Sequence, residues 1–139
     1  MEVGAQGALA PRVVLTDPQV AAVGHTLESA IAAELPVVAI DHPTGSVAGA
    51  SFYGRKAAGT SRLVIDVERE VVVGATVTGP DVAELLHAAT VAIVGAVPLE
   101  RLRHAVPSFP TRSEVWLRLL ERYEAEHRPA RDRLASIIT

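Results

Sequence analysis

The feature that most constrains the fold of this chain is a pair of β-branched runs separated by a short polar turn. The first run spans residues 62–67, the second spans residues 70–77, and Glu68-Arg69 lies between them. Valine and isoleucine favour extended backbone, and two such runs joined by so short a connection predict a β-hairpin. The chain is therefore expected to contain an antiparallel pair of strands on which its other elements pack.

Further strands are predicted on the amino-terminal side of this hairpin. Residues 12–16 are β-branched and end at the turn Asp17-Pro18, and residues 19–23 continue extended. Residues 37–40 form a continuous apolar run, which is typical of a buried strand. The Gly-, Ala- and Ser-rich segment 44–61 is interpreted as an extended or partly strand-like excursion.

Helices are predicted on both sides of the hairpin. Thr26 is suited to cap a short helix over residues 27–35, and a further short helix begins at Pro98. The helix predicted for residues 81–96 is apolar almost all round, which indicates burial on more than one side, one of which we expect to face a partner chain. These elements do not alternate as βαβ units, so the predicted fold class is α+β, with a mostly antiparallel sheet and helices packed on one face.

The stretch from Phe109 to Glu114 joins a sharp backbone feature to a helix start. The Phe109-Pro110 bond is a candidate for a cis peptide. Thr111 and Glu114 have the spacing of a capping box at the start of a helix that runs to about His127. In this helix Val115 and Leu119 define the buried face, and Glu114 and Arg118 have the spacing of an i, i+4 ion pair.

Composition excludes several classes of function. The net charge of −3 gives no electrostatic basis for nucleic-acid binding, and the absence of cysteine excludes disulfides and thiolate ligands in this chain. The five histidines lack the spacing of a metal site, so no metal is expected. Gly49 and Gly54 have phosphate-loop spacing, but Arg55-Lys56-Ala57 replaces the required Lys-Ser/Thr. No apolar run is long enough to span a bilayer, and we expect a soluble, cytoplasmic protein without a membrane partner.

The chain is predicted to form a single folded unit between two less regular ends. Residues 1–10 are interpreted as a flexible tether or a remnant of something upstream, residues 11–127 as the folded domain, and residues 128–139 as a tail. The tail is charged at first and ends in Ala135-Ser136-Ile137-Ile138, which could dock on the domain or fray.

Four segments together resemble the carboxy-terminal dimerisation domain of the flavin-dependent pyridine nucleotide-disulfide oxidoreductases, the group that includes glutathione reductase, dihydrolipoamide dehydrogenase and mercuric reductase. They occur in the order and spacing of that family and cover roughly residues 11–126. The four segments are residues 13–24, 62–78, 81–86 and 109–114.

This resemblance implies an α+β domain that pairs with its own copy about a two-fold axis, and whose last loop reaches the flavin of the partner subunit. In that family the loop usually reads His-Pro-Thr-x-x-Glu, with the histidine as an acid-base group and the glutamate orienting it. Here Phe109 stands at the histidine position, and a phenyl ring cannot carry a proton. Glu114 matches the family glutamate and is the one candidate catalytic residue, but with no imidazole to orient, the capping-box role is favoured for it over a catalytic one. Phe109 and Pro110 are the residues expected to face the partner's FAD in a full-length protein.

The resemblance thus implies the dimerisation domain of an FAD-dependent, NAD(P)H-linked oxidoreductase, whose partners are a second copy and upstream FAD- and NAD(P)-binding domains. The chain has no Gly-x-Gly-x-x-Gly fingerprint and no redox cysteine pair, so alone it is expected to bind neither cofactor and to catalyse nothing. The alternative is a free-standing homodimeric binding or scaffolding module without redox chemistry. An unrelated small enzyme has only the incomplete phosphate-loop signal in its favour.

Overall fold

The structure is a computed structural model that describes residues 10–56 and 58–127. The predicted tail at residues 128–139, and nearly all of the predicted amino-terminal tether, lie outside the described residues.

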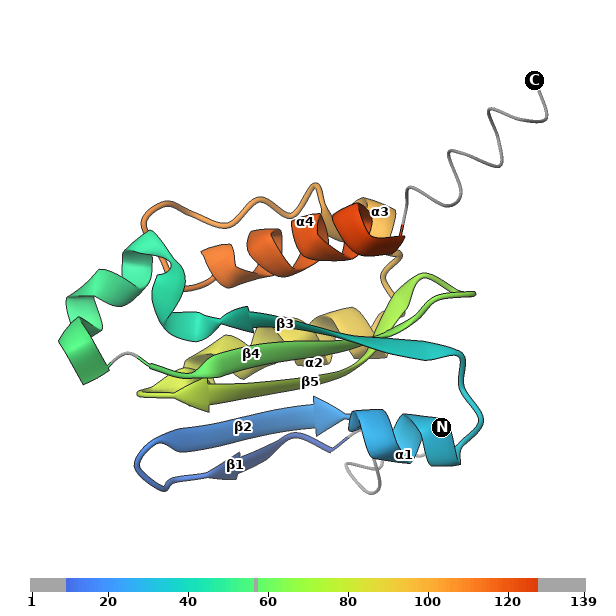
Figure 1. The fold of residues 1–139 in the computed structure, drawn as a ribbon, viewed down its shortest axis with the longest axis horizontal. Helices are drawn as coiled ribbons and strands as arrows, with labels where there is room; N and C mark the ends of the chain where they lie inside the picture. The colour runs from blue at the N-terminus through green and yellow to red at the C-terminus, as the bar shows by residue number, and fades with distance from the viewer. Residues whose placement is uncertain (1–9, 57, 128–139) are drawn as a thin grey trace.

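The core of the fold is a five-stranded sheet in which every neighbouring pair of strands is antiparallel. The strand order is β1-β2-β5-β4-β3, so the sheet consists of the hairpins β1-β2 and β4-β5 together with β3, and β1 and β3 are its two edge strands (Figure 1). The strands are β1 Arg12–Val14, β2 Gln19–Gly24, β3 Val37–Pro43, β4 Thr60–Asp66 and β5 Val71–Gly79.

The hairpin predicted from residues 62–77 is confirmed as β4 and β5, which pair from Ser61 opposite Val77 to Asp66 opposite Val71. Asp66 shapes the turn, because its buried Oδ1 accepts hydrogen bonds from the backbone N–H groups of Glu68 at 3.0 Å and Arg69 at 2.9 Å. A carboxylate that satisfies two turn donors stabilises the reversal of the chain. The polar turn residues in the sequence therefore have a direct structural role.

Three helices cover one face of the sheet, and a short one lies against the other face. The helices are α1 Leu27–Ala32, α2 Leu86–Val94, α3 Leu99–Leu102 and α4 Glu114–His127. Three 3₁₀ segments accompany them: η1 Thr44–Ser46, η2 Ala48–Lys56 and η3 Val82–Leu85. In Figure 1, α2 runs behind β4 and β5, and α4 lies beside β3.

The core divides between the two faces because successive side chains of a strand point to opposite sides. Ile65 and Val72 pack with Leu119 of α4 and Leu86 of α2 in the larger cluster. On the opposite face a smaller cluster joins three valines to Ala30 of α1; the valines are Val64, Val71 and Val73. The predicted α+β class with an antiparallel sheet is confirmed, and α1 adds a limited contact on the second face.

Local signals located most helix starts correctly. Thr26 caps α1 as predicted: its hydroxyl accepts from the Ser29 N–H at 3.0 Å, and the Thr26 N–H donates to the Ser29 hydroxyl oxygen at 3.0 Å. The predicted helix 81–96 is present as η3 followed by α2. No helix among the described residues has the length and apolar character needed to cross a membrane.

The interpretation of residues 44–61 as an extended excursion was wrong for most of its length. The segment turns tightly through η1 and η2 before β4 begins at Thr60. Its entry is held by a buried hydrogen bond of 2.8 Å between the hydroxyls of Thr44 and Ser61. Small residues permit such compact turns as readily as they permit extended backbone, so composition alone did not distinguish the two.

Candidate functional site

The loop that leads into α4 makes a sharp turn. The Phe109-Pro110 peptide bond is cis, as the sequence suggested. The predicted capping box does not form, because α4 begins at Glu114 rather than directly after Thr111. The Thr111 hydroxyl donates to the Ser108 carbonyl oxygen at 2.6 Å. The first turn of the helix is closed by its backbone, with the Glu114 N–H donating to the Thr111 carbonyl oxygen at 3.3 Å. The threonine therefore stabilises the turn before the helix rather than the helix itself.

Arg112 anchors this turn to the segment that follows β5. Its side chain is 8% exposed and donates to the carbonyl oxygens of Pro80 and, at 2.8 Å, of Asp81. These carbonyls belong to the connection between β5 and η3, so one guanidinium joins two segments that are about thirty residues apart. The sequence alone gives no signal of this role, since an arginine within a polar tetrapeptide is typical of a solvated surface.

Gly49 supports the same turn from the other side. A Cβ atom built on Gly49 would lie 2.2 Å from the carbonyl carbon of Thr111, so only glycine lets η2 approach so closely. In the sequence Gly49 stands out only as part of an incomplete phosphate loop. The structure gives it a packing role, at a distance of about sixty residues along the chain.

The tip of the loop is exposed and apolar, in contrast to its anchored base. Phe109 and Val106 are each 76% exposed, and Pro110 is also exposed. A phenyl ring has no proton to donate or accept, so this tip supplies packing surface and no acid-base group. Two large apolar side chains this exposed on one loop indicate a contact surface for another molecule.

Glu114, the candidate catalytic residue, lies at the first position of α4. Its Oε2 atom is buried and has no hydrogen-bond partner among the described residues. The predicted ion pair with Arg118 does not form, because Arg118 pairs with Glu121 at 3.0 Å. A buried carboxylate oxygen without a donor is costly, and it can accept a hydrogen bond from a group that reaches it.

The α2 helix is apolar on its outer face as well as on its inner face. Leu86 and Ala89 are buried against the sheet, whereas Val91 is 54% and Val94 is 74% exposed. His87 was expected to be a core or interface residue, and in the single chain it is exposed. We define the outer face of α2 by His87, Val91 and Val94, which lie on one side of a helix of 3.6 residues per turn.

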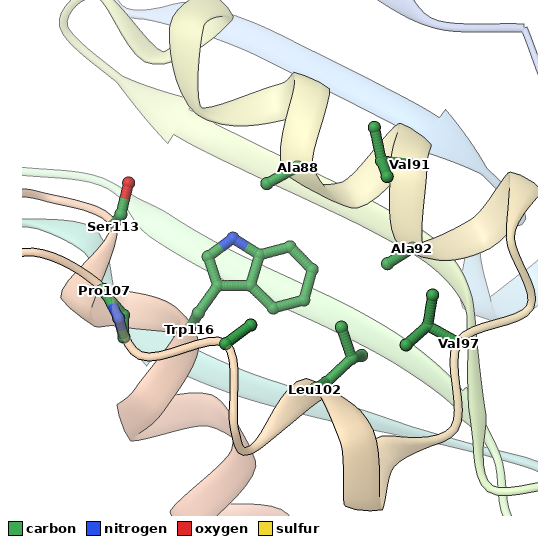
Figure 2. A pocket seen from close by; sticks show the side chains of 9 residues that line it. Ala88, Val91, Ala92, Val97, Leu102, Pro107, Ser113 and Trp116 are labelled. Carbon is green, nitrogen blue, oxygen red and sulfur yellow. The ribbon is translucent and has the colours of Figure 1, made fainter.

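An apolar groove of about 440 Å³ runs between α2, α3 and the start of α4. Figure 2 shows Trp116 at its centre, with Ala88, Val91 and Ala92 on one wall. The other lining residues come from the chain around α3 and from the start of α4: Val97, Leu102, Ala105, Pro107 and Ser113. The groove therefore lies beside the loop tip and the outer face of α2.

The histidines do not form a site together. No group of three or more potential metal ligands occurs within residues 10–56 and 58–127. His42 accepts from or donates to the Ser46 hydroxyl at 2.8 Å, and partial burial, with Arg122 and Arg118 nearby, lowers the pKa of His42. Because Ser46 also lies 2.9 Å from the Pro43 carbonyl oxygen, this pair closes a local turn. His42-Pro43-Thr44 has the His-Pro-Thr order of the loop described for the resembling family, but it lies at the end of β3 and not before α4.

Comparison with known proteins places these features in a family. The family model described as the pyridine nucleotide-disulphide oxidoreductase dimerisation domain matches residues 10–120. The chain is 34% identical over 120 residues to the dihydrolipoyl dehydrogenase of Thermus scotoductus and 31% identical over 106 residues to that of Chlamydia pneumoniae. These alignments cover 86% and 76% of this chain but 25% and 23% of the relatives. The chain thus spans about a quarter of their length.

Solved structures show the same fold. The flavoprotein disulfide reductase RclA from Escherichia coli, described as HOCl-induced, superposes with a TM-score of 0.73 at 21% identity, covering 80% of this chain and 25% of that chain. An NAD-dependent persulfide reductase from A. fulgidus superposes with a TM-score of 0.74 at 16% identity, covering 88% of this chain and 24% of that chain. At these identities the superpositions establish the fold alone.

Proposed function

Because the chain belongs to the pyridine nucleotide-disulphide oxidoreductase family, of which it is a dimerisation domain, we propose that it forms a two-fold interface with a second copy of itself. The parent protein would be an FAD-dependent, NAD(P)H-linked oxidoreductase of which this chain is the dimerising part. Its upstream FAD- and NAD(P)-binding domains would be further partners.

The observation that carries this proposal is the outer face of α2. Val91 and Val94 are more than half exposed on a helix whose inner face already fills the core. Burying these valines against a partner stabilises the complex by about 25 cal/mol for each Å² of apolar surface removed from water. A two-fold axis places the same face on both copies, so an apolar helix face can pack against itself.

The loop tip supports the second part of the proposal, in which Phe109 and Pro110 lie against the partner subunit's flavin. Both residues are exposed apolar groups, and they are carried by a turn that Arg112 and Gly49 hold in place. An aromatic ring and a proline suit packing against the edge or face of a flat ring system. FAD would supply the redox chemistry, and this loop would supply shape and exclude water.

The isolated chain would not catalyse the reaction, since its candidate site contains a carboxylate without an acid-base partner. The sequence contains no cysteine, and Phe109 offers no proton. Titration of FAD with the 139-residue chain, followed by flavin fluorescence, should show no saturable quenching. Saturable quenching at micromolar concentrations would contradict this part of the proposal.

Sedimentation equilibrium tests the interface itself. The full chain should sediment as a dimer at micromolar concentration, and Val91→Asp/Val94→Asp should raise the dimer Kd about 100-fold because each copy then buries two charges. Ile31→Asp is the control, because Ile31 is 60% exposed on α1, which packs on the opposite face of the sheet from α2. A wild-type monomer, or equal weakening by the control, would overturn the proposal.

A further inference from the structure

We propose that the apolar groove between α2, α3 and α4 binds the carboxy-terminal segment of the same chain, residues 134–138. This inference does not depend on the proposed dimer. The two surfaces share Val91, which lines the groove and also belongs to the outer face of α2, whereas Ala88 and Ala92 line the groove alone.

The chemistry of the groove favours aliphatic side chains over a small polar ligand. Among its lining side chains, only the Ser113 hydroxyl and the Trp116 indole N–H can form hydrogen bonds. Pockets for small molecules normally combine an apolar lining with several convergent polar groups that fix the ligand. A groove with almost no polar groups suits a short run of apolar side chains, because the hydrophobic effect depends on the apolar area buried and is not directional.

The end of the chain has the matching pattern. Leu134, Ile137 and Ile138 are the three large aliphatic residues beyond α4, and their spacing is i, i+3 and i+4. This spacing is typical of an amphipathic segment that lays one apolar side into a groove. The residues that precede it, from Arg128 to Arg133, are mostly charged or small and suit a solvated connection.

The position of α4 brings this segment within reach of the groove in its own chain. Arg103 Nη1 and Glu124 Oε1 form an ion pair of 2.7 Å, which joins the last turns of α4 to the end of α3. Leu102, the neighbour of Arg103, lines the groove. Six residues separate His127 from Leu134, and they can extend over roughly 20 Å. Because the tether is this short, binding within one chain is favoured over binding between chains by a high effective concentration.

Trp116 provides a direct readout, because it is the sole tryptophan in the sequence and lies in the groove. In the full chain, Ile137→Asp/Ile138→Asp should shift the Trp116 emission to longer wavelength and increase its quenching by acrylamide. The matched control, Ser136→Asp/Thr139→Asp, adds the same charge to the same segment at polar positions and should leave both values at those of the wild type. Far-ultraviolet circular dichroism should be the same for all three proteins.

A substitution in the groove wall completes the test. Ala105→Asp should produce the same emission shift, and combining it with Ile137→Asp/Ile138→Asp should add little, since both remove one interaction. The wild-type emission should also be unchanged on dilution through the range in which any dimer dissociates. The proposal is overturned if the tail variants leave Trp116 unaffected, if the two sets of variants are additive, or if the effect disappears on dilution, which would indicate binding between chains.

Discussion

The helices α2 and α4 cover the same face of the sheet, yet their outward sides are opposite in character. The outward side of α4 carries ion pairs, Arg118 with Glu121 and Arg122 with Glu126, and its start is anchored by Arg112. The outward side of α2 carries Val91 and Val94. Charged side chains paired along a helix are stable in water, whereas an exposed apolar helix face is stabilised by a partner.

This difference separates a region that completes the fold from a region that serves association. The buried side of α4 fills the main core, and its outward side carries charged side chains paired with one another. The outer face of α2 and the loop tip at Phe109 leave apolar surface uncovered. Substitutions in the first region should therefore change the stability of the single chain, and substitutions in the second should change association.

Leu119→Ala should have the largest effect on stability. Leu119 is 2% exposed in the main core, and removing its side chain leaves a cavity that costs about 2–5 kcal/mol. Urea denaturation of dilute protein measures the loss. Val94→Ala is the comparison in α2, where the expected change is within about 0.5 kcal/mol because Val94 is 74% exposed. Similar losses for both would remove the distinction between the helices.

Gly49→Ala should have the next largest effect, since the added Cβ meets the Thr111 backbone and the α4 start must shift. We expect a loss of about 1–3 kcal/mol in the free energy of unfolding, measured by urea denaturation. Gly54→Ala isolates the conformational cost: its Cβ would meet nothing within 4 Å, but φ of +67° and ψ of −156° lie in a region essentially confined to glycine, which costs about 1–3 kcal/mol. A loss below about 0.5 kcal/mol at position 49 would show that the contact with Thr111 is unimportant.

Phe109→His tests whether a side chain at position 109, in the exposed loop tip, can form a hydrogen bond with the Glu114 carboxylate. The unpartnered Oε2 of Glu114 can accept from an imidazole N–H, and a nearby carboxylate should raise the pKa of that imidazole by about one unit above its ordinary value of about 6.5. An NMR titration measures this pKa. In the double variant Phe109→His/Glu114→Gln the rise should disappear. An equal pKa in both variants would show that the tip and the carboxylate are independent.

Asp41→Asn should have the smallest effect. Hydrogen bonds from Arg62 at 2.7 and 2.8 Å hold the pKa of Asp41 below its ordinary value. The pair therefore stabilises the fold above the unfolded pKa of about 3.9, and this stability is lost as the pH falls through the lower, folded pKa. Both side chains are about 40% exposed, so the effect at pH 7 is about 0.2–1 kcal/mol.

The measurement for Asp41 is the urea midpoint of both proteins from pH 7 down to about pH 2, a range that spans the unfolded pKa of about 3.9. The difference between wild type and variant should shrink across the acidic part of this range. A difference that stays constant with pH would assign the effect of the substitution to a cause other than the Asp41 charge.

Local and periodic signals in the sequence were sufficient to predict most of the fold. The β4–β5 hairpin followed from two valine-rich runs, and the buried side of α4 followed from the spacing of Val115 and Leu119. Both depend on residues close together along the chain. The α2 helix was also expected to be apolar beyond its core face, and its exposed valines agree with that expectation.

The features that hold the candidate site depend on contacts that no local pattern contains. Gly49 meets Thr111, and Arg112 reaches the carbonyl oxygen of Asp81, across long separations in the sequence. The capping box failed for a related reason: α4 begins at Glu114, and the Glu114 N–H donates to the backbone carbonyl oxygen of Thr111 rather than to its hydroxyl. A spacing rule identifies which partners are possible, and the surrounding backbone decides which is used.

The most direct test of the central claim, that the outer face of α2 is the face on which two copies meet, is a distance between identical positions in the dimer. The sequence contains no cysteine, so Val94→Cys and Ile31→Cys each give one unique site for a spin label. Double electron–electron resonance should give a single distance for each labelled dimer, shorter at position 94 than at position 31. A shorter distance at position 31, or no dipolar coupling at either site, would contradict the account.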